Sequence, residues 1–101
     1  MPVGLYLLRD EVGEFLKAVD PSGKEPVARI VSMLDEEYAE LKASLSDRTR
    51  LSHQIYDMLF LLLELASKEN LDLDGEWEKG PVRKRKCTMP RAGELLENGD
   101  A

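Results

Sequence analysis

The amino-acid sequence predicts an all-α protein, and two observations lead to this prediction. Apolar residues recur every three or four positions through three long segments, which is the spacing of one face of a helix. The alternation of apolar and polar residues that marks a half-buried strand is nearly absent. With 101 residues, the chain has the length of one small domain with a modest core.

The first predicted helix runs from Pro2 to about Val19. Charged side chains occupy the face opposite its apolar stripe, as in an amphipathic surface helix. The stripe consists of Leu5, Leu8, Val12, Phe15, Leu16 and Val19. Pro21 and Gly23 follow closely and predict a firm break, because both residues disfavour a helix interior.

The second predicted helix runs from about Pro26 to Ser44, with the proline near its first turn, where its missing N–H is tolerated. Its apolar stripe consists of Ile30, Leu34, Tyr38, Leu41 and Leu45. At about 100° per residue, Glu36, Glu37 and Glu40 fall on one arc that borders this stripe. We therefore expect these three carboxylates at the edge of a helix interface.

The third predicted helix runs from about Arg48 to Lys68, after a good N-cap pair formed by Ser46 and Asp47. Its middle, Met58–Leu63, is apolar on every side and must be covered on every side. Two or three short helices of one chain can hardly cover it, so the sequence predicts a homodimer. Asp57 directly precedes this run.

After Asn70 the sequence predicts only a short helical turn, Gly75–Lys79, which Gly80 and Pro81 end or kink. Trp77 lies within this turn. We predict that it packs against other residues, with stacking on a nucleobase as the alternative.

Charge is distributed unevenly along the chain. The net charge is −6, yet every residue from Arg83 to Lys86 is basic. This run either contacts phosphates or forms a solvated helix end, and composition leaves both open. The acidic excess argues against a nucleic-acid polymer as partner. We expect one domain over residues 1–86 and a polar, flexible C-terminal tail over residues 87–101.

Cysteine content and hydropathy predict a cytoplasmic protein that does not cross a membrane. Cys87 is the single cysteine, so no intrachain disulfide can form. The longest apolar run, Met58–Leu63, is far too short to span a bilayer. The first residues show no basic leader followed by a long apolar stretch.

The acidic residues beside the apolar stripe predict a metal site. Glu36, Glu37, Glu40 and Asp57 would repel one another at a helix interface unless a cation lay among them. The alternative is a solvated acidic face. Oxygen ligands favour Mg²⁺, with Mn²⁺ also suitable, and one Cys with one His is too few for zinc. His53 is expected to be structural or exposed, with a role as base or phosphate contact as the alternative.

These motifs resemble the MazG-like members of the all-α nucleoside triphosphate pyrophosphohydrolase superfamily. The family pattern is Glu-Glu-x-x-Glu on one helix and Glu-x-x-Asp on the next. Here the first half is Glu36-Glu37-x-x-Glu40 and the second is Gln54-x-x-Asp57. The apolar helix, the Trp-containing segment 71–79 and the basic run also resemble the family, so the likeness covers roughly residues 27–86.

The resemblance implies short helices in a four-helix bundle, completed by homodimerisation or as a dimer of dimers. It implies Mg²⁺-dependent cleavage of a nucleoside triphosphate to the monophosphate and pyrophosphate. Phosphoribosyl-ATP pyrophosphohydrolases share the fold and a similar motif and rank second. By this resemblance Glu37 and Glu40 are the catalytic candidates. The implied metal ligands are Glu36, Glu37, Glu40, Gln54 and Asp57, and the implied substrate contacts are Trp77, Lys79, Arg83 and Lys84.

Gln54 departs from the family pattern, which has glutamate at this position. An amide offers one neutral oxygen to Mg²⁺ but no negative charge, and it cannot act as a base. Three outcomes follow: an enzyme with one metal, an enzyme with an altered substrate, or a nucleotide-binding relative that hydrolyses weakly or not at all.

Overall fold

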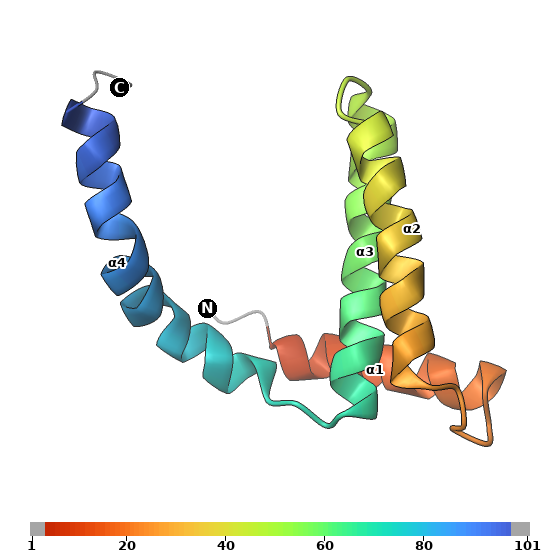
Figure 1. Cartoon of the computed structure of the whole chain (residues 1–101). Coiled ribbons are helices and arrows are strands. Elements are labelled where there is room, and N and C mark those ends of the chain that lie inside the picture. The colour runs from red at the N-terminus through yellow and green to blue at the C-terminus, as the bar shows by residue number, and fades with distance from the viewer. Residues whose placement is uncertain (1–3, 98–101) are drawn as a thin grey trace. The chain divides into compact units, whose positions relative to one another are not determined.

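The structure is a computed structural model that describes the backbone of residues 4–97 and the side chains of residues 4–85. It contains helices α1 (Leu5–Val19), α2 (Val27–Ala43), α3 (Arg48–Lys68) and α4 (Leu73–Glu97), and residues 4–97 include no strand (Figure 1). The predicted all-α class is therefore confirmed. The chain forms two compact units, Met1–Leu71 and Asp72–Ala101. The predicted domain over residues 1–86 with a tail over residues 87–101 stays a prediction.

The first unit is built on an antiparallel pair of helices. Figure 1 shows α2 and α3 side by side, joined by a tight turn, with α1 crossing near the other end of the pair. The α1 and α2 helices each pack against α3. Helix α3 is thus the central element of the unit, in agreement with its apolar composition.

Capping fixes the ends of α3. The Asp47 carboxylate accepts a hydrogen bond from the Arg50 backbone N–H at 3.1 Å, so the predicted N-cap is confirmed. At the other end, Asn70 takes a left-handed conformation with φ of 51°. The Leu71 N–H then donates to the Ala66 carbonyl at 2.9 Å, which satisfies a carbonyl of the last turn. Both predicted ends of α3, Arg48 and Lys68, agree with the structure.

The connection between α1 and α2 is held by one carboxylate. Asp20 accepts hydrogen bonds from the Glu25 backbone N–H at 3.1 Å and from the Ser22 hydroxyl at 3.0 Å. These bonds, led by the one from Glu25, hold the pKa of Asp20 below its usual value. Gly23 has a φ of 65°, a conformation that glycine adopts without strain, so the predicted break is a structured turn.

The N-terminal end of α1 differs from the prediction. The sequence suggested a start at Pro2, but α1 begins at Leu5, and Pro2 lies outside the described residues. Gly4 has a φ of 74°, which is incompatible with a right-handed helix, and it forms the N-cap instead.

The core of the first unit is small. It consists of Val12, Ile30, Leu61, Leu63 and Ala66. Helix α1 approaches α3 closely at Gly13, where a Cβ atom would lie 2.6 Å from the Ser67 hydroxyl oxygen. The predicted stripe of α2 is only partly covered, because Tyr38 and Leu45 are exposed although Ile30 is fully buried.

The apolar run of α3 is also half covered. Leu61 and Leu63 are buried in the core, whereas Leu59 is 44% exposed and Leu62 is 50% exposed. A single chain therefore leaves part of this helix in contact with water, as its composition suggested.

Glu64 is a buried carboxylate beside this core, with 8% of its surface exposed. Burial raises its pKa, the nearby Glu25 carboxylate raises it further, and Lys68 offsets part of the effect. A raised pKa in the folded state means that ionisation of Glu64 opposes folding. The stabilising contribution of its neutral form is complete below the ordinary value of 4.5 and is lost as pH rises through the folded pKa.

We therefore expect Glu64→Gln to be more stable than the wild type near neutral pH and nearly equal to it below pH 4.5. Urea unfolding followed by circular dichroism at both pH values measures this difference. Glu69→Gln is the matched control, because Glu69 is exposed just beyond the same helix. A stability difference that is the same at both pH values would show that Glu64 does not titrate as inferred.

Helix α4, in the second unit, corrects the prediction of a short turn over Gly75–Lys79. It continues through Gly80 and Pro81 to Glu97, and its axis is bent along its length (Figure 1). Proline removes one backbone hydrogen bond but does not end this helix.

Side-chain interactions support the start of α4 and the part of it around Gly80 and Pro81. The Asp72 carboxylate accepts from the Gly75 N–H at 3.0 Å at the start of α4. Arg83 pairs with Glu76 at 3.0 Å across the Gly80–Pro81 step.

The predicted flexible tail over residues 87–101 coincides with the last part of α4. The backbone of residues 87–97 is helical, and residues 98–101 lie outside the described part of the chain. Flexibility of this tail stays a prediction. Within the described residues, no helix is long and apolar enough to cross a membrane.

Candidate functional site between α2 and α3

The antiparallel pairing of α2 and α3 brings the two halves of the acidic motif to the same part of the first unit. Glu37 is half-buried on α2, and Gln54 on α3 is 8% exposed. Asp57 is half-buried, whereas Glu36 and Glu40 are exposed. Of these five predicted metal ligands, only Gln54 is buried.

Glu37 and Gln54 form the central contact of this region. The Gln54 Nε2 atom donates to the Glu37 carboxylate and also to the Glu37 backbone oxygen, the latter at 3.1 Å. One amide therefore binds both the side chain and the main chain of Glu37. This contact ties α2 to α3 and holds the Glu37 carboxylate in place.

Asp57 has a different partner. His53, one turn earlier on α3, places its Nε2 atom 3.3 Å from the Asp57 carboxylate. His53 itself is exposed, as expected from the sequence. If the imidazole is protonated, the pair is an ion pair at the surface, where such pairs contribute little stability.

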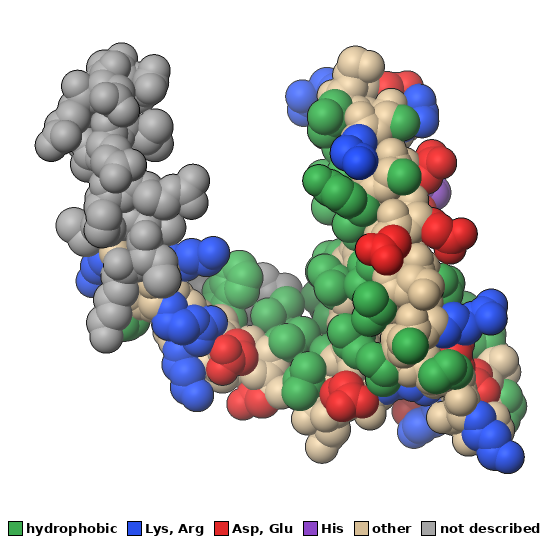
Figure 2. Space-filling model, viewed as in Figure 1, with side chains coloured by type: hydrophobic (Ala, Val, Ile, Leu, Met, Phe, Trp, Pro, Cys, Tyr) green, Lys and Arg blue, Asp and Glu red, His purple; other side chains and the backbone are tan. Residues whose placement is uncertain are grey.

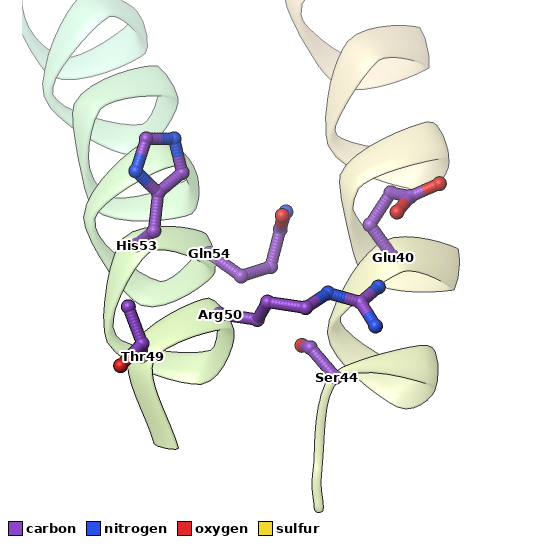
Figure 3. A pocket seen from close by; sticks show the side chains of 6 residues that line it. All are labelled: Glu40, Ser44, Thr49, Arg50, His53 and Gln54. Carbon is purple, nitrogen blue, oxygen red and sulfur yellow. The ribbon is translucent and has the colours of Figure 1, made fainter. Parts of the chain in front are cut away.

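A pocket of about 280 Å³ opens beside Gln54, between the end of α2 and the start of α3 (Figure 3). It is lined by Glu40, Ser44, Thr49, Arg50, His53 and Gln54. The sequence analysis named Glu40, His53 and Gln54 but missed the other three. A helical spacing of four residues places Arg50 on the same face of α3 as Gln54, and this signal could have identified it.

Ser44 is the most enclosed residue of the pocket lining. It is buried where α2 ends, and its hydroxyl donates to the Leu41 carbonyl at 3.0 Å. This bond gives the hydroxyl a partner at a carbonyl of the last turn of α2.

The predicted metal ligands are not gathered into one group. Within the described residues, no three His, Cys, Asp or Glu side chains lie close enough together to hold a metal ion. Glu37 and Gln54 are in contact, while Asp57 pairs with His53. The donor chemistry still suits Mg²⁺, because every predicted ligand offers oxygen.

The predicted substrate contacts lie on α4, in the second unit. Lys79 and Arg83 both pair with Glu76, at 3.9 and 3.0 Å. Lys84 is exposed, and Trp77 is 73% exposed. Among the side chains that the structure describes, residues 4–85, the packing role predicted for Trp77 therefore has no counterpart.

Comparison of the chain with protein-family models, curated proteins and solved structures gave no match. The resemblance to MazG-like proteins therefore rests on the residues of this chain alone.

Proposed function

We propose that this protein is an Mg²⁺-dependent nucleotide pyrophosphohydrolase, which cleaves a nucleoside triphosphate to the monophosphate and pyrophosphate. The contact between Glu37 and Gln54 carries the proposal. These residues belong to the two halves of the acidic motif, and the α2–α3 pair brings them together. A solvated acidic face would not require a buried amide to bind one of its carboxylates.

The metal would be held by Glu37 and Gln54, with Glu36, Glu40 and Asp57 as further ligands. Bound Mg²⁺ would neutralise charge on the substrate phosphates and lower the pKa of a coordinated water. Asp57 would have to leave His53 to join this group, so binding involves a side-chain rearrangement on α3.

The chain's own residues contribute orientation and proton transfer. Gln54 holds Glu37 through one hydrogen bond to its carboxylate and one to its backbone carbonyl, and it cannot itself accept a proton from water. Glu37 and Glu40 are the carboxylates available to act as a general base. Because Gln54 supplies no negative charge, the site suits one metal ion better than two.

A second copy of the chain would complete the fold as a homodimer. Figure 2 shows hydrophobic side chains gathered along the α2–α3 pair. Exposed members on these helices include Val31, Tyr38, Ile55, Tyr56, Leu59 and Leu62. An apolar surface that extends along both helices is costly in water and is typical of an interface.

A nucleotide-binding protein without hydrolytic activity is the second candidate. Gln54 favours it, because the amide occupies the Glu37 carboxylate and replaces a charged ligand with a neutral one. A substrate like phosphoribosyl-ATP is the third possibility, since enzymes acting on it share the motif.

Pyrophosphate release from a panel of NTPs, dNTPs and phosphoribosyl-ATP tests the proposal, with Mg²⁺, Mn²⁺ and EDTA arms. We expect release that requires the metal and that EDTA abolishes. Absence of release from all substrates by folded protein would overturn the proposed hydrolysis. Binding of nucleotide under the same conditions would then favour the second candidate.

A further inference from the structure

The pocket beside Gln54 is lined by one basic side chain, Arg50, which does not belong to the acidic motif. Arg50 lines this pocket, and Figure 3 shows its side chain extending from α3 toward α2, between Glu40 and Ser44. Among the described residues, the Arg50 guanidinium forms no ion pair or side-chain hydrogen bond. Its backbone N–H alone is used, by the Asp47 cap.

The chemistry of the pocket suits phosphate better than a nucleobase. All six side chains that line it are polar or charged, and only His53 offers a ring. A base would find little surface for stacking there. A guanidinium, by contrast, matches the oxygen atoms of a phosphate group through paired hydrogen bonds.

The position of Arg50 relates this pocket to the proposed metal site. Arg50 precedes Gln54 by one helical turn, which is about 6 Å along α3. A polyphosphate bound to a metal at Glu37 and Gln54 would therefore reach Arg50 with its next phosphate groups. Glu40, in the same pocket, would repel those phosphates unless the metal were present.

We propose that Arg50 binds the pyrophosphate end of the substrate, so that the phosphate chain runs from the Glu37–Gln54 contact toward the α2–α3 turn. The inference rests on the proposed function for the position of the metal. It assigns a substrate contact to the first unit, in addition to the basic residues predicted on α4. It also predicts that phosphate binding at Arg50 depends on Mg²⁺.

Isothermal titration of the full chain with inorganic tripolyphosphate, pyrophosphate, orthophosphate and a nucleoside monophosphate tests the inference, with Mg²⁺ or EDTA. The Arg50→Ala substitution should weaken the binding of tripolyphosphate and of pyrophosphate about tenfold or more when Mg²⁺ is present. Binding of the monophosphate should not change. Arg50→Lys should give an intermediate loss, because lysine keeps the charge without the planar fork.

Arg48→Ala is the matched control. Arg48 is exposed in the same first turn of α3 but does not line the pocket. We expect it to bind tripolyphosphate as the wild type does. Equal losses in the Arg48 and Arg50 variants would indicate general charge attraction and overturn the inference.

The result separates this inference from the proposed function. Wild-type turnover with unchanged pyrophosphate binding in Arg50→Ala would refute the inference alone. Arg50-dependent binding of tripolyphosphate without turnover would refute the hydrolysis alone. If the wild type neither binds tripolyphosphate nor hydrolyses nucleotides, both are wrong.

Discussion

Replacement of Glu37 by glutamine should nearly abolish Mg²⁺-dependent pyrophosphate release while the protein stays folded. The substitution keeps the size of the side chain and an oxygen that accepts the Gln54 hydrogen bond, but it removes the charge. Loss of residues that merely support metal ligands costs about 10–100-fold in activity or affinity, so loss of a direct ligand should lower kcat/KM about a hundredfold or more.

Asp35→Asn is the control for this experiment. Asp35 is exposed two residues earlier on α2 and lies outside the acidic motif, so its substitution changes the net charge equally. We expect wild-type activity from it. Light scattering should give both variants the same mass as the wild type. Mg²⁺-dependent activity retained by Glu37→Gln would exclude Glu37 as the principal ligand.

Replacement of Gln54 by glutamate should destabilise the metal-free protein and make its stability depend strongly on Mg²⁺. The new carboxylate would be nearly buried and would lie against that of Glu37, where the amide now donates. One favourable hydrogen bond would become a repulsion between like charges, which should cost about 2 kcal/mol or more without metal. Because Mg²⁺ is proposed to bind the folded state, it should raise the melting temperature of this variant more than that of the wild type.

Ser52→Glu is the matched control. Ser52 is exposed on the same helix, and its replacement by glutamate adds the same charge. We expect little change in melting temperature with or without Mg²⁺. A Gln54→Glu variant as stable as the wild type in EDTA would contradict the buried contact. Turnover should also rise if Gln54 limits metal binding, whereas unchanged turnover with retained nucleotide binding would favour a dedicated binding protein.

Helix α3 could be predicted from the sequence because its ends depend on short-range signals. Asp47 caps the start through a hydrogen bond only three residues away, and Asn70 supplies the left-handed conformation at the end. The positions of α1 and α2 follow from apolar periodicity in the same way. Only the first turn of α1 was misjudged, since the left-handed conformation of Gly4 is not encoded by periodicity.

The extent of α4 could not be predicted, because local rules give conflicting answers there. Gly80 and Pro81 disfavour a helix interior, but Asp72 starts the helix and the Glu76–Arg83 pair bridges the weak step.

Only part of the candidate site could be predicted, because its contacts depend on how the helices pack. Spacing along each helix identified Glu37 and Gln54, but their direct contact depends on how α2 packs on α3. The pocket depends on the same packing, so Ser44 had no signal of its own, whereas the four-residue spacing of Arg50 from Gln54 could have marked Arg50. The pairing of Asp57 with His53, instead of with Glu37, likewise depends on side-chain geometry that spacing does not specify.

The contact between Glu37 and Gln54 spans only 17 positions of the chain, across the tight turn of one helical hairpin. The entropy lost in closing so short a loop is small, and contacts near in sequence form early and fast. The groups proposed for chemistry therefore also lie where folding of the first unit can begin. Selection on the motif for metal affinity would then act on the folding rate as well, since the same two side chains join the two helices of this hairpin.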